Sequence, residues 1–267
     1  MLLGGLNKLS TLDYPSKVSA VAFTLGCDFR CPYCHNPDLL SAGGPPVAES
    51  EVLAYLDKRK NLIDALVVSG GEPTLQPDLP AFLSQVKAMG YLIKLDTNGS
   101  NPHIGKNLNA SSLIDSVALD LKADLTDWPE ALAPKTADGT SPATKILQTL
   151  NLLKDSGFPS EFRTTCASPF VTAQAILSLA KLAQGDIPWY LQQYRPDTVA
   201  NPAYMRRFPD QPDENDLLAF QKLASDYLPC HVRLASVPRT PVPFTAAQLP
   251  TAPFPSLRGS DALAQVA

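Results

Sequence analysis

Short apolar runs rich in β-branched residues alternate along this chain with segments that have the period of a helix. Such runs, bounded by polar residues and glycine, are typical of buried strands. They occupy residues 18–25, 65–69, 91–95, 116–121, 161–165 and 189–193, and a shorter run follows at 231–234. The chain is therefore expected to build a sheet from about six strand units.

The segments between the runs carry large apolar residues three and four positions apart. After the second run, Leu79, Phe82, Leu83 and Val86 fall on one helical face, and Gly90 stands where a helix C-cap belongs. Further helices are predicted in the same way around residues 146–153, 172–183 and 213–227. This alternation predicts the α/β class, with a parallel sheet, helices outside it, and a partial (β/α)6 barrel.

The C-terminal part of the chain breaks this pattern. Residues 237–267 are rich in proline and have little hydrophobic period, which is typical of an extended or disordered tail. The expected organisation is one barrel domain over residues 1–236 followed by this Pro-rich C-terminal tail.

Composition narrows the classes of function. A chain of 267 residues, 45% of them hydrophobic, can bury a full core, and its net charge of −4 gives no electrostatic reason to expect nucleic-acid binding. No apolar run is long enough to span a membrane. The five cysteines are sparse and odd in number, and no signal-peptide core opens the chain, so a reducing, cytoplasmic location is expected. Cys166 and Cys230 have no local partner and are expected to be ordinary buried thiols.

The other three cysteines lie close together directly after the first strand. Cys27, Cys31 and Cys34 have the spacing C-x3-C-x2-C and are followed at once by His35-Asn36-Pro37. Three thiolates can hold three corners of a cubane iron–sulfur cluster and leave one iron open for a substrate. A structural zinc site with His35 as fourth ligand is the alternative, but zinc sites are usually built from two separated pairs.

Polar residues also follow the next strands. In parallel α/β sheets, ligands bind at the carboxyl ends of strands, so these groups are expected to meet at one rim of the barrel. The segments are Gly70-Gly71-Glu72-Pro73, Asp96-Thr97-Asn98-Gly99, Asp120-Leu121-Lys122 and Arg163-Thr164-Thr165.

The cysteine spacing, with Tyr33 before the last cysteine, resembles that of the radical S-adenosylmethionine (SAM) superfamily. Residues 12–15 and 26–37 are similar to the glycyl-radical-enzyme activases. Within these, the chain resembles most the anaerobic ribonucleoside-triphosphate reductase activating proteins, in their longer form, which resembles pyruvate formate-lyase activase. The resemblance covers about residues 10–200, and it implies a radical SAM partial barrel.

The resemblance implies roles for particular residues. The three cysteines would ligate a [4Fe-4S] cluster, and the amino and carboxylate groups of SAM would chelate the open iron. Tyr33 would lie against the adenine. The strand end that carries Gly70, Gly71 and Glu72 would meet the SAM amino group, since backbone carbonyls and a carboxylate accept hydrogen bonds from such a donor.

The same resemblance implies a second set of contacts. Lys122 and Arg163 would bind the SAM carboxylate, Arg163 in a bidentate pair. Asp96, Thr97 and Asp120, with a backbone carbonyl of the fourth strand, would form a site for a monovalent cation. Two neighbouring carboxylates would otherwise repel each other.

The resemblance also implies the reaction. One electron from the reduced cluster would cleave SAM to methionine and a 5′-deoxyadenosyl radical, which would take a hydrogen from the Cα of a glycine in a partner enzyme. The expected partner is the anaerobic (class III) ribonucleoside-triphosphate reductase, and the expected reductant is a flavodoxin or ferredoxin. Two alternatives stay open: a radical SAM enzyme acting on a small molecule, similar to 7-carboxy-7-deazaguanine synthase, and a non-catalytic metal-binding module.

Two positions depart from the family pattern. Ser16 stands where the family's turn has glycine, which leaves the conformation of that turn open. The segment Gln193-Tyr194-Arg195 stands where pyruvate formate-lyase activase has Pro-Tyr-His. Arg195 either replaces the histidine at the nucleoside or pairs with a surface carboxylate.

Overall fold

The computed structural model describes residues 1–40, 46–103, 107, 111–135, 139–196 and 198–235. The expected tail at residues 237–267 lies outside these ranges. Among the described residues, no helix has both the length and the apolar character that crossing a membrane requires.

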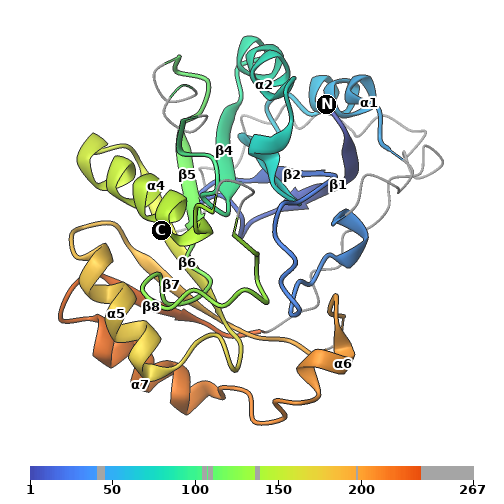
Figure 1. Ribbon diagram of the computed structural model, residues 1–267. Coiled ribbons are helices and arrows are strands. Elements are labelled where there is room, and N and C mark those ends of the chain that lie inside the picture. The colour runs from blue at the N-terminus through green and yellow to red at the C-terminus, as the bar shows by residue number, and fades with distance from the viewer. Residues whose placement is uncertain (41–45, 104–106, 108–110, 136–138, 197, 236–267) are drawn as a thin grey trace, which may run out of the picture.

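Eight strands form a single sheet in which the order in space follows the order in the chain (Figure 1). β1 pairs antiparallel with β2, and every later pair is parallel. The predicted α/β architecture with its parallel sheet is thus confirmed. The strands are β1 Leu3–Ser10, β2 Ser19–Thr24, β3 Ala65–Gly70, β4 Leu92–Thr97, β5 Ser116–Asp120, β6 Ser160–Cys166, β7 Trp189–Gln193 and β8 Cys230–Arg233.

β1 was not predicted from the sequence. Two glycines and three polar residues interrupt its apolar pattern, and glycine weakens a strand interior. Pairing with β2 supplies the missing stabilisation, because the register brings Leu6 opposite Ala22 and Asn7 opposite Val21. Tertiary contact therefore overrides the weak local preference here.

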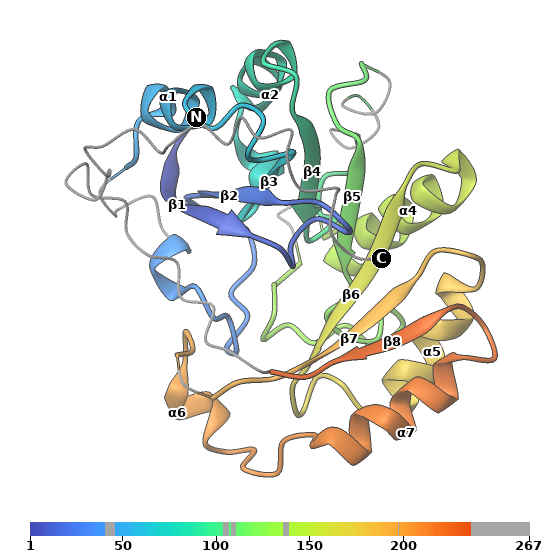
Figure 2. The ribbon, with the colours of Figure 1, turned by 180° about the vertical axis from the view of Figure 1, so that it is seen from behind.

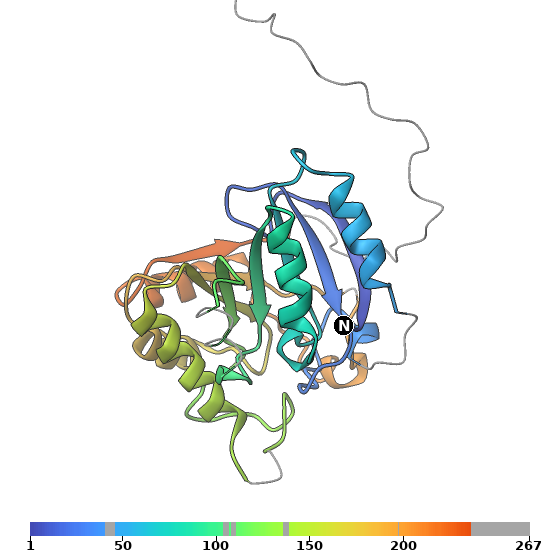
Figure 3. The ribbon, with the colours of Figure 1, turned by 90° about the horizontal axis from the view of Figure 1, so that it is seen from above.

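Five of the described helices, α1, α2, α4, α5 and α7, lie on the outer side of the curved sheet (Figures 2 and 3). The predicted helices are confirmed as α2, α4, α5 and α7, whereas α1 and the short α6 were not predicted. Two short 3-10 helices, Pro37–Leu39 and Pro73–Leu75, lie among the described residues as well. The α-helices are α1 Glu49–Asp57, α2 Leu79–Ala88, α4 Pro142–Ser156, α5 Ala173–Ala183, α6 Pro202–Met205 and α7 Glu214–Ala224.

The two faces of the sheet differ in polarity. Ile93, Leu95 and Phe162 are fully buried and belong to the main hydrophobic core, which the helices cover. Side chains alternate along a strand, so Lys94 and Asp96 face the opposite, inner side. The parallel register places Asp120 beside Arg163 on that side. Apolar burial against helices therefore stabilises the sheet, while its inner face is left for polar groups.

Candidate functional site

The site begins with the segment after β2, residues 26–36, which we call the cysteine loop. Backbone hydrogen bonds fix its first residue: the Gly26 N–H donates to the Leu39 carbonyl at 2.8 Å, and the Glu72 N–H donates to the Gly26 carbonyl at 2.8 Å. The Arg30 N–H donates to the Leu132 carbonyl at 2.7 Å. Contacts from the segment that follows it and from two distant parts of the chain thus hold a loop that has no regular structure.

The chain between β7 and α7 closes over the cysteine loop. The Ala200 N–H donates to the Cys34 carbonyl at 3.0 Å, and the Asn201 N–H donates to the Pro32 carbonyl at 2.9 Å. Sequence reasoning did not anticipate this contact, because nothing local to either segment indicates it. The pairing supplies hydrogen-bond donors to the carbonyl groups of Pro32 and Cys34.

The three clustered thiols line one cavity of about 190 Å³. Cys31 is buried and Cys27 and Cys34 are half-buried, and all three are free. Burial raises the pKa of Cys27 to about 12 and that of Cys31 to about 11, and it also raises the pKa of Cys34. The thiols therefore keep their protons at neutral pH until a metal displaces them.

The arrangement of the thiols bears on the kind of metal group they fit. Within the described ranges, no three His, Cys, Asp or Glu side chains converge to hold one metal ion. A zinc ion gathers its sulfur ligands at about 2.3 Å around one centre, whereas a cubane cluster spreads its thiolates over separate irons. Three thiols on one cavity supply the sulfur ligands that an iron–sulfur cluster needs.

Most of the predicted site residues meet at this cavity. Those that line it are Cys27, Cys31, Tyr33, Cys34, Gly70, Gly71, Asp96, Asp120 and Lys122, together with Thr97. Glu72 and Arg163 are not among its lining residues, and neither is Arg195. Sequence reasoning missed Phe29, Ser69 and Leu40; the first two are neighbours of the motifs and could have been found by adjacency.

Glycine at the end of β3 allows close approach of two loops. A Cβ at Gly71 would lie 2.0 Å from the Gly26 carbonyl oxygen, and a Cβ at Gly70 would lie 2.3 Å from the Thr24 backbone nitrogen. Gly70 also has a φ of 117°, which residues with a Cβ rarely adopt. The glycine pair is therefore required for the cysteine loop to pack against β3.

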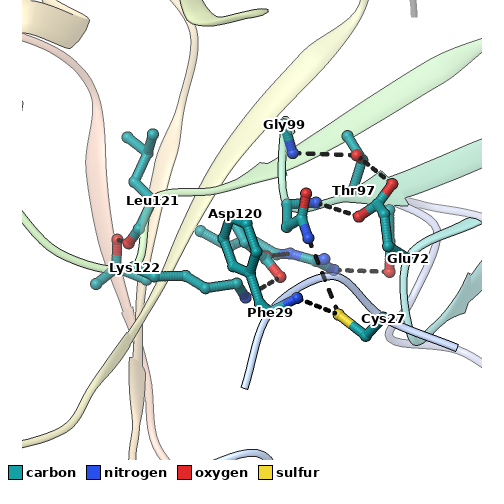
Figure 4. A network of polar contacts seen from close by, with 12 residues as sticks. Cys27, Phe29, Glu72, Thr97, Gly99, Asp120, Leu121 and Lys122 are labelled. Carbon is teal, nitrogen blue, oxygen red and sulfur yellow. Dashed lines mark hydrogen bonds and ion pairs between the residues drawn. The ribbon is translucent and has the colours of Figure 1, made fainter. Parts of the chain in front are cut away.

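The carboxylate of Glu72 is fully buried and held by the chain itself (Figure 4). One oxygen accepts from the Thr74 N–H at 3.1 Å, the Thr74 hydroxyl at 2.5 Å and the Thr97 hydroxyl at 2.7 Å. The other accepts from the Asn98 N–H at 2.7 Å. Burial raises the pKa of Glu72 to about 7, although these hydrogen bonds oppose the shift. The structure thus places Glu72 as an anchor of the turn after β4, and its predicted contact with the SAM amino group stays a prediction.

Asn98 connects that turn to the cysteine loop. Its side-chain amide donates to the Asp28 carboxylate at 2.8 Å and lies 4.0 Å from the Cys27 sulfur. The Phe29 N–H also donates to this sulfur, at 3.4 Å. A path of hydrogen bonds therefore runs from Glu72 through Asn98 to the first cysteine.

Charged groups at the ends of β4, β5 and β6 form ion pairs across the inner face. Arg163 bridges two carboxylates: Nη1 lies 2.9 Å from Asp96 and Nε lies 3.0 Å from Asp120. Lys122 Nζ lies 3.0 Å from Asp120, as Figure 4 shows. Burial disfavours the charge on Asp120, but the two cations outweigh burial and lower its pKa to about 2. Burial also opposes the charge on Lys122, yet Asp120 raises its pKa well above the ordinary value. Arg163 supplies the positive charge between the two carboxylates, and the predicted monovalent cation stays a prediction.

Tyr33 is buried beside the last two cysteines. Its ring packs on Phe170 with the centroids 5.4 Å apart, and its hydroxyl lies 3.5 Å from the Lys122 carbonyl oxygen. These contacts hold the ring at the cavity wall, where the resemblance places a ring for the adenine.

Three further positions singled out from the sequence are also seen in the structure. Ser16 has a φ of 59°, so the turn keeps the left-handed conformation that favours glycine. Cys166 and Cys230 are buried, as expected for ordinary thiols.

Comparison with known proteins agrees with this geometry. Residues 21–183 match the radical SAM superfamily. A protein of Methanocaldococcus jannaschii named "Putative glycyl-radical enzyme activating enzyme MJ1227" is 34% identical over 228 residues, which cover 85% of this chain and 93% of that protein. The pyruvate formate-lyase-activating enzyme of Clostridium pasteurianum is 30% identical over 161 residues, covering 57% of this chain and 66% of that enzyme.

A solved structure resembles the fold. Streptococcus suis SuiB bound to S-adenosylmethionine has a TM-score of 0.58 and 17% identity, and the match covers 78% of this chain and 48% of SuiB. The chain thus spans about half the length of that protein. The match over residues 21–183 and the near full-length relative, together with three thiols on one cavity at the carboxyl ends of parallel strands, place this chain in the radical SAM superfamily.

Proposed function

We propose that this radical SAM enzyme is an activase that generates a glycyl radical on a partner enzyme. The observation that carries the proposal is the relative named as a glycyl-radical enzyme activating enzyme, which aligns with 85% of this chain. Pyruvate formate-lyase-activating enzymes align with shorter parts of it. The three thiols and the polar rim around them supply the site that such an activity needs.

The radical SAM family implies a [4Fe-4S] cluster and SAM as cofactors. We propose Cys27, Cys31 and Cys34 as the cluster ligands. When bound, the cluster and SAM would supply the radical chemistry that removes a hydrogen atom from the glycine. This chain orients the cofactors and excludes water, for which the backbone pairing over Cys34 is suited.

The proposed SAM contacts follow the positions around the cavity. Tyr33 would lie against the adenine, and the strand end that carries Gly70, Gly71 and Glu72 would meet the amino group. Lys122, which lines the cavity, would bind the carboxylate. Arg163 would contribute through the carboxylates that it bridges, or by turning from them toward SAM.

The monovalent cation is proposed at the same carboxylates. Asp96, Thr97 and Asp120 offer hard oxygens that line the cavity. Arg163 already pairs with Asp96 and Asp120, so a bound cation would compete with the guanidinium for them.

The proposed partner is the anaerobic ribonucleoside-triphosphate reductase, with a flavodoxin or ferredoxin as electron donor in a reducing cytoplasm. The sequence features that support this choice are the His35-Asn36-Pro37 extension, Asp96-Thr97-Asn98-Gly99 and Asp120-Leu121-Lys122. An enzyme acting on a small molecule, similar to 7-carboxy-7-deazaguanine synthase, is the second candidate.

The test uses anaerobically reconstituted protein, SAM, a reductant and the class III reductase of the same organism. The expected result is a glycyl-radical doublet in the electron paramagnetic resonance spectrum, caused by the remaining α-hydrogen. A partner whose radical-bearing glycine is changed to alanine is the matched control and should give no doublet. If SAM is cleaved but no glycyl-radical protein of that organism acquires the signal, the activase proposal fails and the small-molecule candidate replaces it.

A further inference from the structure

An alternating series of charged side chains crosses the inner face of the sheet. We call the series the ion-pair chain, and each member lies within ion-pair distance of the next. In order, with the N···O distance to the following member, it consists of Arg233 (3.5 Å), Glu161 (2.7 Å), Lys94 (3.4 Å), Asp96 (2.9 Å), Arg163 (3.0 Å), Asp120 (3.0 Å) and Lys122. It begins on the edge strand β8 and ends at the cavity.

The most deeply buried member is Lys94 in the middle of β4. Its side chain is 1% exposed, and its ammonium group also donates to the Asp13 carbonyl at 2.7 Å. Its partner Glu161 is 5% exposed. Burying an ammonium group costs several kcal/mol, and an apolar side chain could occupy a buried strand position without that cost. The sequence predicted an apolar strand here, so the burial of this charged side chain calls for an explanation.

The formal charges of the ion-pair chain do not cancel. Its cations are Arg233, Lys94, Arg163 and Lys122, and its anions are Glu161, Asp96 and Asp120, so one positive charge remains at neutral pH. Removing Lys94 alone would leave three complete pairs: Arg233 with Glu161, Arg163 with Asp96, and Lys122 with Asp120. The buried lysine is therefore the member that makes the series cationic.

The excess positive charge acts at the end of the ion-pair chain that reaches the cavity. Asp120 is shared between Arg163 and Lys122, so one carboxylate faces two cations there. Lys122 lines the cavity beside the cysteines. Lys94 and Arg163 share the negative charge of Asp96, so this carboxylate neutralises Arg163 less completely. Arg163 in turn takes up part of the negative charge of Asp120.

We propose that Lys94 is a positioning residue that keeps one net positive charge on the ion-pair chain and so sets the affinity of the cavity for the carboxylate of SAM. This inference rests on the proposed cofactor site. It gives Lys94 a role through Asp96, Arg163 and Asp120, without contact to SAM.

The test measures SAM dissociation constants on the reconstituted enzyme by equilibrium dialysis. Lys94→Met removes the charge at similar volume and should raise the constant about twofold to thirtyfold, the usual range for coupling through such a network. Glu161→Gln raises the net charge and should leave the constant unchanged or lower it. The double variant Lys94→Met/Glu161→Gln restores one net positive charge and should return toward the wild-type constant.

A purely structural role predicts a different pattern, in which both single variants weaken binding and the double variant is at least as weak. That result overturns the proposal. Decarboxylated SAM is the matched probe, and its dissociation constant should not change in Lys94→Met; an equal weakening for this probe also overturns the proposal. If Lys94→Met does not fold, Glu161→Gln decides alone, and a raised constant refutes the inference.

These measurements need no partner enzyme. A failure of the activase proposal would appear as a missing glycyl radical while the SAM constants keep the expected order. A failure of the present inference would appear in the SAM constants while the glycyl radical still forms.

Discussion

The buried carboxylate of Glu72 should make the stability of this protein depend on pH in an unusual direction. Burial raises its folded-state pKa to about 7 from an ordinary value of 4.5. Between these two pH values the folded chain keeps a proton that the unfolded chain has lost. The free energy of unfolding contributed by this group is therefore full below pH 4.5 and falls as the pH rises toward 7.

The size of the effect follows from the shift. Each pKa unit corresponds to about 1.4 kcal/mol, so a difference of about 2.5 units lowers the free energy of unfolding by about 3 kcal/mol across this window. Hydrogen bonds from Asn98, Thr74 and Thr97 reduce the shift and are already included in the value of about 7. Because Glu72 is fully buried, screening by solvent does not diminish the effect.

The assay is urea unfolding of metal-free, reduced protein between about pH 4 and 8, with wild type and Glu72→Gln measured in parallel. The glutamine cannot titrate, so the difference in unfolding free energy between the two proteins isolates this one group. That difference should move by about 3 kcal/mol against the wild type between pH 4.5 and 7. A difference that is constant over this range, or that moves in favour of the wild type, refutes the reasoning.

Three further outcomes are expected from other parts of the site. Gly71→Ala should lower iron incorporation, because the new Cβ would press on the backbone at the start of the cysteine loop. Gly90 has a positive φ, but a Cβ there would meet no atom within 4 Å, so Gly90→Ala should lose only about 1 kcal/mol of stability and keep its iron. Asp120→Asn should remove about 2 kcal/mol of unfolding free energy that the wild type has above pH 3.8 and loses as the pH falls toward 2, which acid unfolding of both proteins measures. Cys31→Ala should abolish SAM cleavage and lower iron below about four per chain, whereas Cys166→Ala should leave both intact; equal loss in the second variant contradicts the assignment of the ligands.

Local sequence patterns predicted much of the fold. Six apolar runs and four helical segments appear in the structure at the expected places, because strand and helix periods are properties of neighbouring residues. The cysteine spacing and the glycine pair after β3 are equally local, so they place the site at the carboxyl ends of the strands without any knowledge of long-range contacts.

The sequence did not predict which partners the site side chains contact. The structure shows contacts that the sequence did not predict: Glu72 accepts a hydrogen bond from the Asn98 N–H, and Arg163 bridges Asp96 and Asp120, while the contacts of both residues with SAM stay predictions. Which groups meet across a sheet depends on the register between strands far apart in the chain, and no local pattern encodes that register.

The same reason explains the features that sequence reasoning missed. β1 forms because β2 pairs with it, and the segment at Ala200 covers the cysteine loop only once β7 is in place. Lys94 interrupts the predicted apolar strand, and only the folded sheet brings Glu161 within 2.7 Å of it. The sequence by itself determined most of the strands and helices and the chemistry that they carry; the tertiary structure decided which charges are buried together, since burial and pairing exist only in the folded sheet.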